Sequence, residues 1–400
     1  MSEWSERLWE RCKPHAGWFA LLAAGGLAVI GIMAIGTVPL KEAEATKQGC
    51  WLLAGLAAMI VCICPHAKQI GAWTYAATIA VTLLLIVPVI PGVPEAVAPV
   101  RNGTRHWINL RFMLLQPSEL AKVCFVLALA RYLRHRDSYR TVPGLLVPFL
   151  IMFVPVALIL REPDLGTAIL FPPVLFAVLL AAGARLRHLS ILGGLGVAAL
   201  TINIAVILLL PNSMQLLKPY QVNRIRAMVD LARGGTSFTD REGYQQAKAM
   251  MLVGSGGLTG LGKDRAQTIL RFNPLPEAHN DMVFAVVAAR WGLVGAVLLL
   301  GLYGLLIGSL LHITLHTKDP FARLATVGFA AIICTQVFVN IGMSLGIMPI
   351  IGITLPFVSY GGSSLVAGFI MVGLAFNFAS QRPLLIMQPS FEFSHADAAG

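Results

Sequence analysis

The chain has 400 residues, of which 57% are hydrophobic and only 12% are charged. Soluble domains carry about twice that share of charged residues, so the composition excludes a soluble globular protein and indicates one that crosses a membrane several times. The formal net charge of +11 does not indicate a nucleic-acid partner, because positive loops that face anionic lipid explain much of the excess. The 6 cysteines show no paired spacing typical of a zinc or redox site.

Apolar runs of about 20 residues predict transmembrane helices. The runs in this chain predict one all-α, polytopic membrane domain with about ten transmembrane helices. They lie near residues 15–36, 50–66, 69–91, 118–134, 143–160, 165–182, 188–210, 281–312, 322–348 and 362–380. Residues 212–280 then form a large loop between the seventh and eighth helices. The first run has no small-residue cleavage site before Lys41, so it is expected to stay as a span rather than act as a signal peptide.

Lys and Arg in short loops mark the cytoplasmic side of a membrane protein. With the N-terminus inside, the inner segments hold Arg7, Arg11, Lys13, Lys68, Arg131, Arg134, Arg136, Arg140, Arg185, Arg187, Lys318, Arg323 and Arg382. The short outer loops hold only Lys41, Lys47 and Arg161. Residues 92–117 and 212–280 are long loops, which translocate whatever their charge. Both termini are therefore predicted to be cytoplasmic, and the long loops to lie outside the cell.

The first polar stretch at an outer helix end is Gln116-Pro117-Ser118-Glu119. Ser118 is predicted as the N-cap, and Glu119 suits the positive end of the helix dipole, which by itself could explain that residue. Lys122 lies at the unfavourable end of the dipole and needs a partner, and Glu119 is three residues back on the same face. A paired lysine at the outer membrane face is well placed to meet a phosphate.

Two further stretches at outer helix ends allow a structural and a functional interpretation. Asp164, in the turn Arg161–Ala168, is either a plain helix cap or the third member of a charged cluster with Glu119 and Lys122. The run Gly361–Ser364 serves either capping and close packing or, through free backbone N–H groups at a helix start, the binding of an anion.

The predicted outer loop 212–280 is basic, with nine Lys and Arg residues against five acidic residues. Within it, residues 243–257 predict an amphipathic helix along the membrane surface, with Ala247, Met250, Met251 and Gly254 on one face. A loop of this length is usually functional or disordered, and this one is too apolar and too patterned for disorder. The glycines that follow lack the spacing of a nucleotide-binding loop.

The loop ends in His279-Asn280-Asp281, where the chain re-enters the membrane. Asp281 has two interpretations. It caps the following helix, or it acts as a general base at the water–lipid boundary, with the pKa of its carboxyl set by the local polarity.

Taken together, the motifs resemble the SEDS family of RodA, FtsW and SpoVE peptidoglycan polymerases. The matching stretches are WINL…QPSELAK, EPDLGTA, LKPYQVNRI, GYQQAK…GSGGLTGLG, LPEAHNDMVFAVVA and FVNIGM…LGIMPIIGITLPFVSYGGSS. They occur in the family's order over about residues 100–380. The resemblance implies a ten-helix glycosyltransferase that joins lipid II into glycan strands at the outer face of the bacterial plasma membrane. It also implies a class B penicillin-binding transpeptidase as partner and Asp281 as the essential acid.

The resemblance and the charges together give a set of expected site residues. Asp281 is expected to be catalytic. The residues expected to bind substrate are Lys122, Glu119, Arg111, Asp164, His279, Arg224, Ser363 and Ser364. Basic side chains, or a divalent cation such as magnesium, would stabilise the leaving diphosphate, and no residue is expected as a metal ligand.

The chain departs from the family pattern in several places, among them the family's DP…DP segment, which reads DLARGGTSFTDRE here. Asn280 stands where the family has Thr, and Ala289 and Arg290 stand where it has two acids, so the pairing that those acids make is in doubt. The stretch LKPYQVNRI and the short C-terminal tail favour the RodA type, which acts in cell elongation and shape, over FtsW.

Two other functions remain to be compared with the enzyme. A lipid II flippase should place its polar residues near the middle of the membrane and show inverted repeats, whereas here they gather at the outer surface and no repeat is found. In a non-catalytic scaffold for a transpeptidase, Asp281 would only cap a helix.

Overall fold

The computed structural model describes residues 15–100, 104–111, 113–134, 136, 138–209, 219–232 and 243–381. The described chain is mostly helical, which confirms the predicted fold class. The first helices are α2 (Ala16–Ile35), α3 (Glu42–Ile63), α4 (Ala67–Ile86), α5 (Pro117–Leu133), α6 (Leu146–Arg161), α7 (Leu165–Ala168), α8 (Phe171–Ala182) and α9 (Leu186–Leu209). The others are α10 (Pro219–Ala232), α11 (Tyr244–Ser255), α12 (Gly262–Phe272), α13 (Val283–His316), α14 (Pro320–Ser344) and α15 (Gly362–Ser380).

Within the described residues, 9 helical segments are long and apolar enough to cross a membrane. They correspond to nine of the ten predicted spans. The remaining predicted span, residues 118–134, is α5, which has 17 residues and packs against α4, α6 and α14 inside the bundle. The span predicted at 165–182 is interrupted between α7 and α8, because Pro172 and Pro173 in the first turn of α8 have no N–H to continue the helix.

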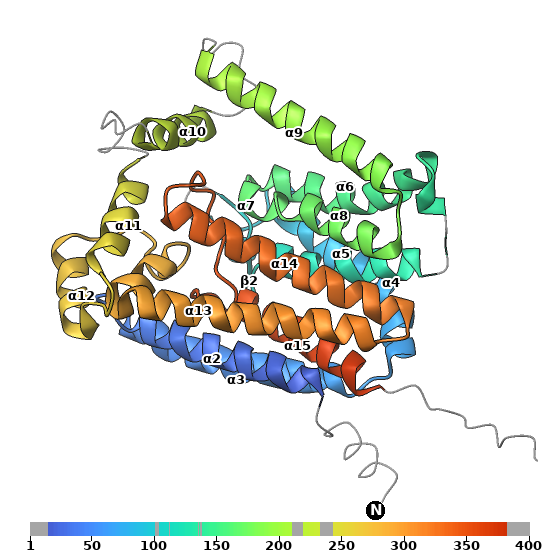
Figure 1. Ribbon diagram of the computed structural model, residues 1–400, viewed down its shortest axis with the longest axis horizontal. Coiled ribbons are helices and arrows are strands. Elements are labelled where there is room, and N and C mark those ends of the chain that lie inside the picture. The colour runs from blue at the N-terminus through green and yellow to red at the C-terminus, as the bar shows by residue number, and fades with distance from the viewer. Residues whose placement is uncertain are drawn as a thin grey trace, which may run out of the picture.

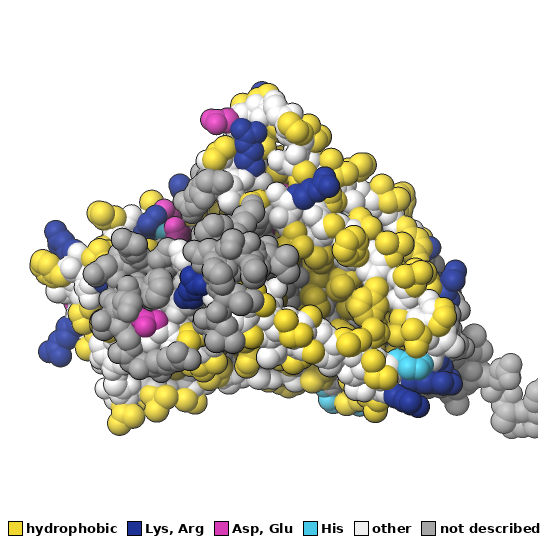
Figure 2. Space-filling view, turned by 90° about the horizontal axis from the view of Figure 1, so that it is seen from above, with side chains coloured by type: hydrophobic (Ala, Val, Ile, Leu, Met, Phe, Trp, Pro, Cys, Tyr) yellow, Lys and Arg dark blue, Asp and Glu magenta, His cyan; other side chains and the backbone are white. Residues whose placement is uncertain are grey.

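The helices form an elongated bundle in which segments distant in sequence lie side by side (Figure 1). α2 packs along α13, α3 along α15, and α4 along α5. α9 diverges from the bundle and is largely exposed along its length, as expected of a helix surrounded by lipid. Figure 2 shows a broad area of hydrophobic side chains beside the atoms drawn in grey, with few Lys and Arg side chains inside that area. This distribution fits a protein whose middle is embedded in lipid.

The loops between the helices contact one another in two groups, one at each end of the bundle. At one end, Gln116 bonds to Asp164, Arg290 bonds to Thr37, and Ser359 bonds to the backbone of Asn280. We call this the Asp281 end. At the other end, Arg134 forms an ion pair with Asp319 at 3.2 Å, and Asn377 bonds to the carbonyl of Pro65. We call this the Arg134 end. The grouping agrees with the predicted alternation of outer and inner loops, and the side of the membrane that each end faces stays a prediction.

α13 is interrupted near its start, at Gly292, whose backbone has φ +66°. At this interruption, backbone N–H groups of α13 donate hydrogen bonds to carbonyls of the turn between α11 and α12. Leu293 N donates to Gly257 O at 2.9 Å, and Val294 N donates to Leu258 O at 3.1 Å. A Cβ at position 292 would lie against the backbone of Leu258 and Gly260. Only glycine fits this contact, which fastens the α11–α12 segment to the start of α13.

Replacing Gly292 by Ala should therefore lower stability by about 2 kcal/mol or more, since alanine is strained at positive φ and its Cβ overlaps backbone. Gly301→Ala is the matched control on the same helix, because a Cβ there meets nothing within 4 Å. Thermal unfolding of both variants in detergent measures the difference. Equal midpoints for the two variants would contradict the packing described at the interruption.

The helix predicted within the loop is present as α11, and its place along the membrane surface stays a prediction. Of the four residues expected on its apolar face, Ala247 is buried in the protein, whereas Met250 and Met251 are exposed. The face packed on the protein holds Gln246, Ala247, Ala249 and Leu252. Gln246 donates hydrogen bonds to the carbonyls of Met343 and Met348, so α11 packs through a polar side chain on the end of α14 and the segment after it.

Candidate active site

The site is organised around the segment between α14 and α15, residues 345–361, which we call the α14–α15 connector. It lies beside three separate parts of the chain. Ile350 O accepts a hydrogen bond from Arg224 of α10 at 2.8 Å. Gly166 at the start of α7 packs closely against Ile351. A Cβ at Gly352 would lie 4.0 Å from Asp281 Oδ2. The connector thus borders both Asp281 and the turn that carries Asp164.

Asp281 lies two residues before α13 and is 8% exposed. The N-cap of α13 is Met282, and it has no side-chain cap hydrogen bond, so the interpretation of Asp281 as a helix cap is wrong. Its Oδ1 instead accepts a hydrogen bond from Gln245 Nε2 at 3.5 Å. In a non-catalytic scaffold, Asp281 would only cap the helix. The absence of that cap leaves the scaffold interpretation without an explanation for Asp281.

The protonation of Asp281 is shifted toward neutral pH. Burial, with a smaller contribution from the negative charge of Glu277, raises the pKa of the Asp281 carboxyl to about 7. The positive charge of Arg224 acts in the opposite direction. A carboxyl whose pKa lies near the working pH is suited to accept a proton from a substrate hydroxyl.

His279 is held by the connector, because Tyr360 N donates to His279 O at 2.9 Å. The ring centroids of His279 and Tyr360 lie 5.8 Å apart. Burial, and then the positive charge of Lys41, lowers the pKa of His279. These surroundings disfavour a positive charge on the imidazole, and binding of substrate by His279 stays a prediction.

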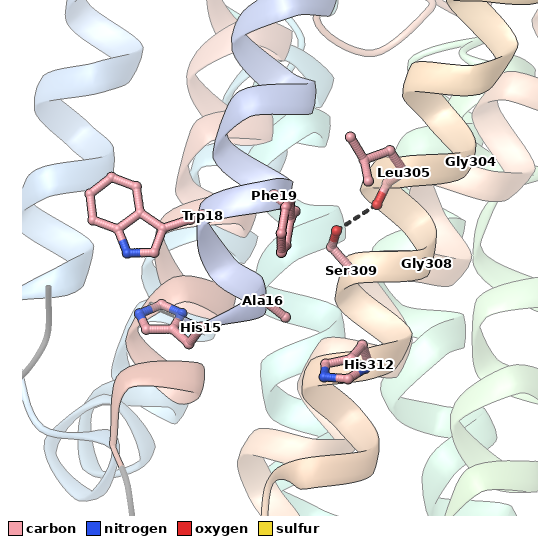
Figure 3. Close-up of a pocket in the computed structure, with 9 residues that line it drawn as sticks. All are labelled: His15, Ala16, Trp18, Phe19, Gly304, Leu305, Gly308, Ser309 and His312. Carbon is pink, nitrogen blue, oxygen red and sulfur yellow. Dashed lines mark hydrogen bonds between the residues drawn. The ribbon is translucent and has the colours of Figure 1, made fainter. Parts of the chain in front are cut away.

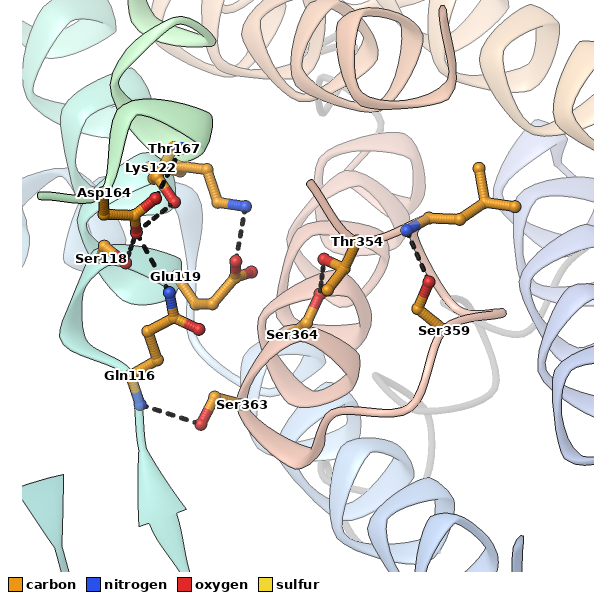
Figure 4. Close-up of polar contacts among 11 residues, drawn as sticks. Gln116, Ser118, Glu119, Lys122, Asp164, Thr167, Thr354, Ser359, Ser363 and Ser364 are labelled. Atoms are coloured by element: carbon orange, nitrogen blue, oxygen red, sulfur yellow. Dashed lines mark hydrogen bonds and ion pairs between the residues drawn. The ribbon is translucent and has the colours of Figure 1, made fainter. Parts of the chain in front are cut away.

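The predicted pair between Lys122 and Glu119 is present near the start of α5, with Nζ 2.9 Å from Oε1 (Figure 4). Both side chains are nearly inaccessible, at 3% and 7% exposure. A buried ion pair is weak evidence for a purely stabilising role, since well-packed apolar residues often stabilise a protein as much. The predicted N-cap is wrong: the cap of α5 is Gln116, and Ser118 Oγ instead donates to Asp164 Oδ2 at 3.4 Å.

Asp164 caps α7, as one of its two interpretations predicts, and Thr167 N donates to its Oδ1 at 2.9 Å. Its other oxygen, Oδ2, receives bonds from Thr167 Oγ1 at 2.7 Å and from Gln116 Nε2 at 3.2 Å. Neutral donors therefore surround this carboxylate (Figure 4). Asp164 lies beside the start of α5, and its contacts are those of a residue that joins α7 to α5.

The two predicted serines at the start of α15 connect this helix to neighbouring segments. Ser363 Oγ donates to Leu114 O and accepts a bond from Gln116 N, both at 3.0 Å, so it fixes the small hairpin of β1 (Ile108–Asn109) and β2 (Leu114–Leu115). Ser364 Oγ lies 3.3 Å from Thr354 Oγ1 of the connector. Arg111 lies in the turn of the hairpin, with φ +69°, and is exposed. Binding of substrate by these three residues stays a prediction.

Several polar residues of the site were not predicted from the sequence. Asn340 and Gln48 are buried inside helices and bond to backbone around the connector. Glu162 is 2% exposed and neither carboxylate oxygen has a hydrogen-bond partner. Burial, followed by the charge of Asp164, raises the pKa of Glu162 to about 8, so this side chain is mostly protonated at pH 7. A neutral amide or a glutamate beside a turn gives no charge pattern that would have indicated these positions.

The residues of the site do not form a metal centre by themselves. In the described parts of the chain, no group of three or more His, Cys, Asp and Glu side chains is placed to share a metal ion. Magnesium is commonly held by one or two carboxylates together with phosphates of the substrate. The divalent cation expected from the resemblance therefore has no ready set of protein ligands here.

A separate groove of about 760 Å³ opens between α2 and α13 (Figure 3). It is lined by His15, Ala16, Trp18, Phe19, Gly304, Leu305, Gly308, Ser309 and His312. These residues lie at the start of α2 and toward the end of α13, which is the Arg134 end. The groove is thus at the far end of the molecule from Asp281 and is not part of the candidate site.

The fold and the site define a polytopic helical membrane protein with a buried acid and a buried Lys–Glu pair at one end. A family model for FtsW, RodA and SpoVE, described as "Cell cycle protein", matches residues 16–383. The chain belongs to this family, which is the SEDS family that its motifs resemble.

Individual relatives agree with the family match. The chain is 36% identical to a Thiomicrospira cyclica protein named "Probable peptidoglycan glycosyltransferase FtsW", over 71% of this chain and 70% of that protein. It is 31% identical to stage V sporulation protein E of Bacillus subtilis, over 76% and 78% of the two chains.

Solved structures share the fold. RodA of Thermus thermophilus is 29% identical, with a TM-score of 0.64 over 90% of this chain and 95% of that one. A chain described under "Structural coordination of polymerization and crosslinking by a peptidoglycan synthase complex" is 32% identical, with a TM-score of 0.76 over 92% and 98% of the two chains.

Proposed function

We propose that this protein is a peptidoglycan glycosyltransferase that polymerises lipid II into glycan strands at the outer face of the bacterial plasma membrane. The observation that carries the proposal is Asp281, a buried carboxyl with a pKa raised to about 7 that does not cap a helix. Family membership and the glycosyltransferase names of the relatives support the class of enzyme.

The chemistry follows from the structure of lipid II, a disaccharide peptide joined to a polyprenyl chain through a diphosphate. The 4-hydroxyl oxygen of one substrate attacks the anomeric carbon at the end of the growing strand. A new glycosidic bond forms, the bond from that carbon to the diphosphate breaks, and the configuration inverts. Asp281 accepts the proton of the attacking hydroxyl, and the polyprenyl diphosphate leaves with the electron pair of the broken bond.

Basic side chains at the Asp281 end are proposed to hold the diphosphate. Lys122 is the strongest candidate, because its ammonium group is buried beside the carboxylate of Glu119. Arg224 is also placed to contribute, since it acts on the charge of Asp281 and binds the connector. Charges that are fixed before the reaction stabilise a leaving diphosphate without reorganisation.

A class B penicillin-binding transpeptidase is the proposed partner. Support comes from the similar chain that was solved within a peptidoglycan synthase complex, because a complex that polymerises and crosslinks combines a glycosyltransferase with a crosslinking enzyme. Co-purification of tagged protein from native membranes tests this, and the loss of the transpeptidase after mild detergent extraction at low salt would count against it.

The growth process that the enzyme serves is proposed to be cell elongation. The stretch LKPYQVNRI and the short C-terminal tail favour this choice. The FtsW names of the relatives make division the competing process. A fluorescent fusion at native expression separates the two, because elongation predicts signal along the side wall and division predicts signal at midcell.

The direct test of the proposed activity uses purified protein in proteoliposomes with labelled lipid II. Glycan strands that grow with time and release polyprenyl diphosphate would support the enzyme. Movement of intact lipid II across the bilayer without any strand would instead support the flippase. Neither activity, in protein that still binds a transpeptidase, would support the scaffold.

The orientation of the chain gives a prediction of its own. In a variant without native cysteines, a cysteine at Thr268 on the exposed face of α12 should react with a membrane-impermeant thiol reagent in intact cells. A cysteine at Lys318, in the turn between α13 and α14, should react only after lysis. The physical reason is the basic character of the short loops at the Arg134 end. The reverse pattern would place Asp281 in the cytoplasm and exclude the proposed reaction.

A further inference from the structure

Three consecutive backbone carbonyls around Asp281 accept hydrogen bonds from one neighbouring part of the chain. Tyr360 N donates to His279 O at 2.9 Å. Ser359 Oγ donates to Asn280 O at 2.5 Å, and Asn340 Nδ2 donates to Asp281 O at 2.8 Å. All three donors belong to α14 or to the α14–α15 connector. The backbone that carries the acid is therefore held at three successive residues by one neighbouring part of the chain.

Asn340 makes the bond closest to the acid. It lies one turn before the end of α14 and is 0% exposed. The same Nδ2 also donates to Ile353 O at 2.7 Å, so a single amide joins Asp281 to the residue that follows Gly352. The orientation of this amide is fixed, because the reverse orientation would place its oxygen against two carbonyl oxygens. Asn340 therefore sets how far the Asp281 backbone lies from the connector.

The connector is braced in turn by a polar side chain from α3. Gln48 is 1% exposed. Its Nε2 donates to Ser359 O at 3.0 Å, and its Oε1 accepts a bond from Gly361 N at 3.1 Å. Ser359 Oγ also accepts a bond from Leu355 N at 2.7 Å. Two of the three donors that hold the Asp281 turn, Ser359 and Tyr360, thus lie in a segment that is bonded to α3.

We propose that Asn340 is the positioning residue of the active site, whose amide fixes the Asp281 carboxyl in the place where it meets the attacking hydroxyl. The assignment rests on the proposed role of Asp281 as general base. Gly352 supports it, because a side chain there would reach Asp281 Oδ2. The connector segment that Asn340 holds against the acid therefore passes directly beside the carboxyl.

The test is the Asn340→Leu variant, which keeps a similar volume but cannot bond to the two carbonyls. Displacing a catalytic group by about 1 Å costs on the order of 100-fold in rate, so kcat per folded protein should fall about 10- to 100-fold. KM for lipid II should stay within about twofold, because Asn340 contacts backbone rather than substrate. Rates are measured with labelled lipid II and normalised to the folded fraction.

The pH profile of kcat provides a readout that a general loss of stability does not move. In the parent protein, the rate should rise with pH up to about 7, where Asp281 loses its proton. When the turn is released, Asp281 becomes more exposed and its pKa returns toward the usual range. The acidic limb of the profile for Asn340→Leu should then move to lower pH by about one unit.

Asn377→Leu is the matched control. Asn377 of α15 is also 0% exposed, and its Nδ2 donates to the carbonyls of Cys62, Ile63 and Pro65 at the Arg134 end. Its loss should lower the folded fraction but leave kcat per folded protein and the pH profile unchanged. If Asn340→Leu behaves like this control, the positioning role is overturned.

Two further variants keep the result decisive. If Asn340→Leu does not fold, Ser359→Ala removes another of the three hydrogen bonds that hold the Asp281 turn. It should shift the acidic limb of the pH profile in the same direction. An unchanged profile for Ser359→Ala would then overturn the proposal. Asp281→Asn tests the general base separately from its positioning by Asn340. If the Asp281→Asn variant is active, Asp281 is not the general base. If it is inactive, the role of Asp281 stands and the variants of Asn340 and Ser359 decide the positioning role.

Discussion

Replacing Asp281 by Asn should abolish glycan polymerisation while the protein remains folded in the membrane. The amide has nearly the same shape but cannot accept the proton of the attacking hydroxyl, and loss of a general base costs about 100- to 10,000-fold in rate. The folded state should tolerate the change, because the carboxyl does not cap α13 and its contact with Gln245 is long, at 3.5 Å. Strand synthesis from labelled lipid II by purified variants measures the effect.

Glu277→Gln is the matched control for this prediction. Glu277 is an exposed acid four residues earlier, and its charge contributes to the raised pKa of Asp281. Its removal should leave the enzyme active and should lower the pKa of Asp281, so the acidic limb of the rate profile should move to lower pH. Strands of normal length and amount from Asp281→Asn would show that Asp281 is not the base.

Removal of the Lys122 ammonium group is expected to give the second-largest effect. Lys122→Ala should raise KM for lipid II by about tenfold or more, which corresponds to about 1.4 kcal/mol of lost binding. Glu119→Ala should also impair activity, with a smaller effect on binding. Either single change leaves one buried charge without its partner, which destabilises a protein by about 3–5 kcal/mol, so the folded fraction has to be measured with each variant.

The double variant Glu119→Gln/Lys122→Met separates binding from stability, because it removes both charges and keeps the volumes. If Lys122 binds a phosphate, the double variant folds like the parent but keeps the raised KM. Restored activity in the double variant would mean that the pair is only structural. Lys41→Ala is the matched control, because Lys41 forms the same kind of pair with Glu44 at 2.8 Å but is 33% exposed, and its loss should change little.

The membrane helices could be predicted from the sequence because each is a long apolar run, but their ends could not always be predicted. The span expected at 322–348 ends as α14 at Ser344. The residues that follow are as apolar as the helix, and the chain leaves the helix at Gly346, which has φ +80°. The span expected at 50–66 begins earlier, at Glu42 of α3, because Glu42 and Glu44 suit the first turn of a helix and give no apolar signal.

The charged residues of the site could be predicted from the sequence, whereas its neutral amide residues could not. Lys122 at the wrong end of a helix dipole required a partner, and the pair with Glu119 is present. Asp281 stood out because it is ionisable at a membrane boundary. Asn340 and Gln48 are single amides within apolar helices, and their importance comes from the carbonyls that they meet after the chain has folded. Those carbonyls belong to residues far away in the sequence, so no local pattern indicates them.

The brace between α3 and the α14–α15 connector has a consequence for how the protein is made. Gln48 is separated by 311 residues from Ser359 and by 313 from Gly361, the two residues that it binds. A chain emerging from the ribosome carries Asp281 into the membrane well before it has synthesised the segment that holds this residue. The geometry of the acid is therefore completed among the last events of biogenesis. Nascent and prematurely terminated chains should accordingly be inert, and activity should begin only when the final helix has been inserted.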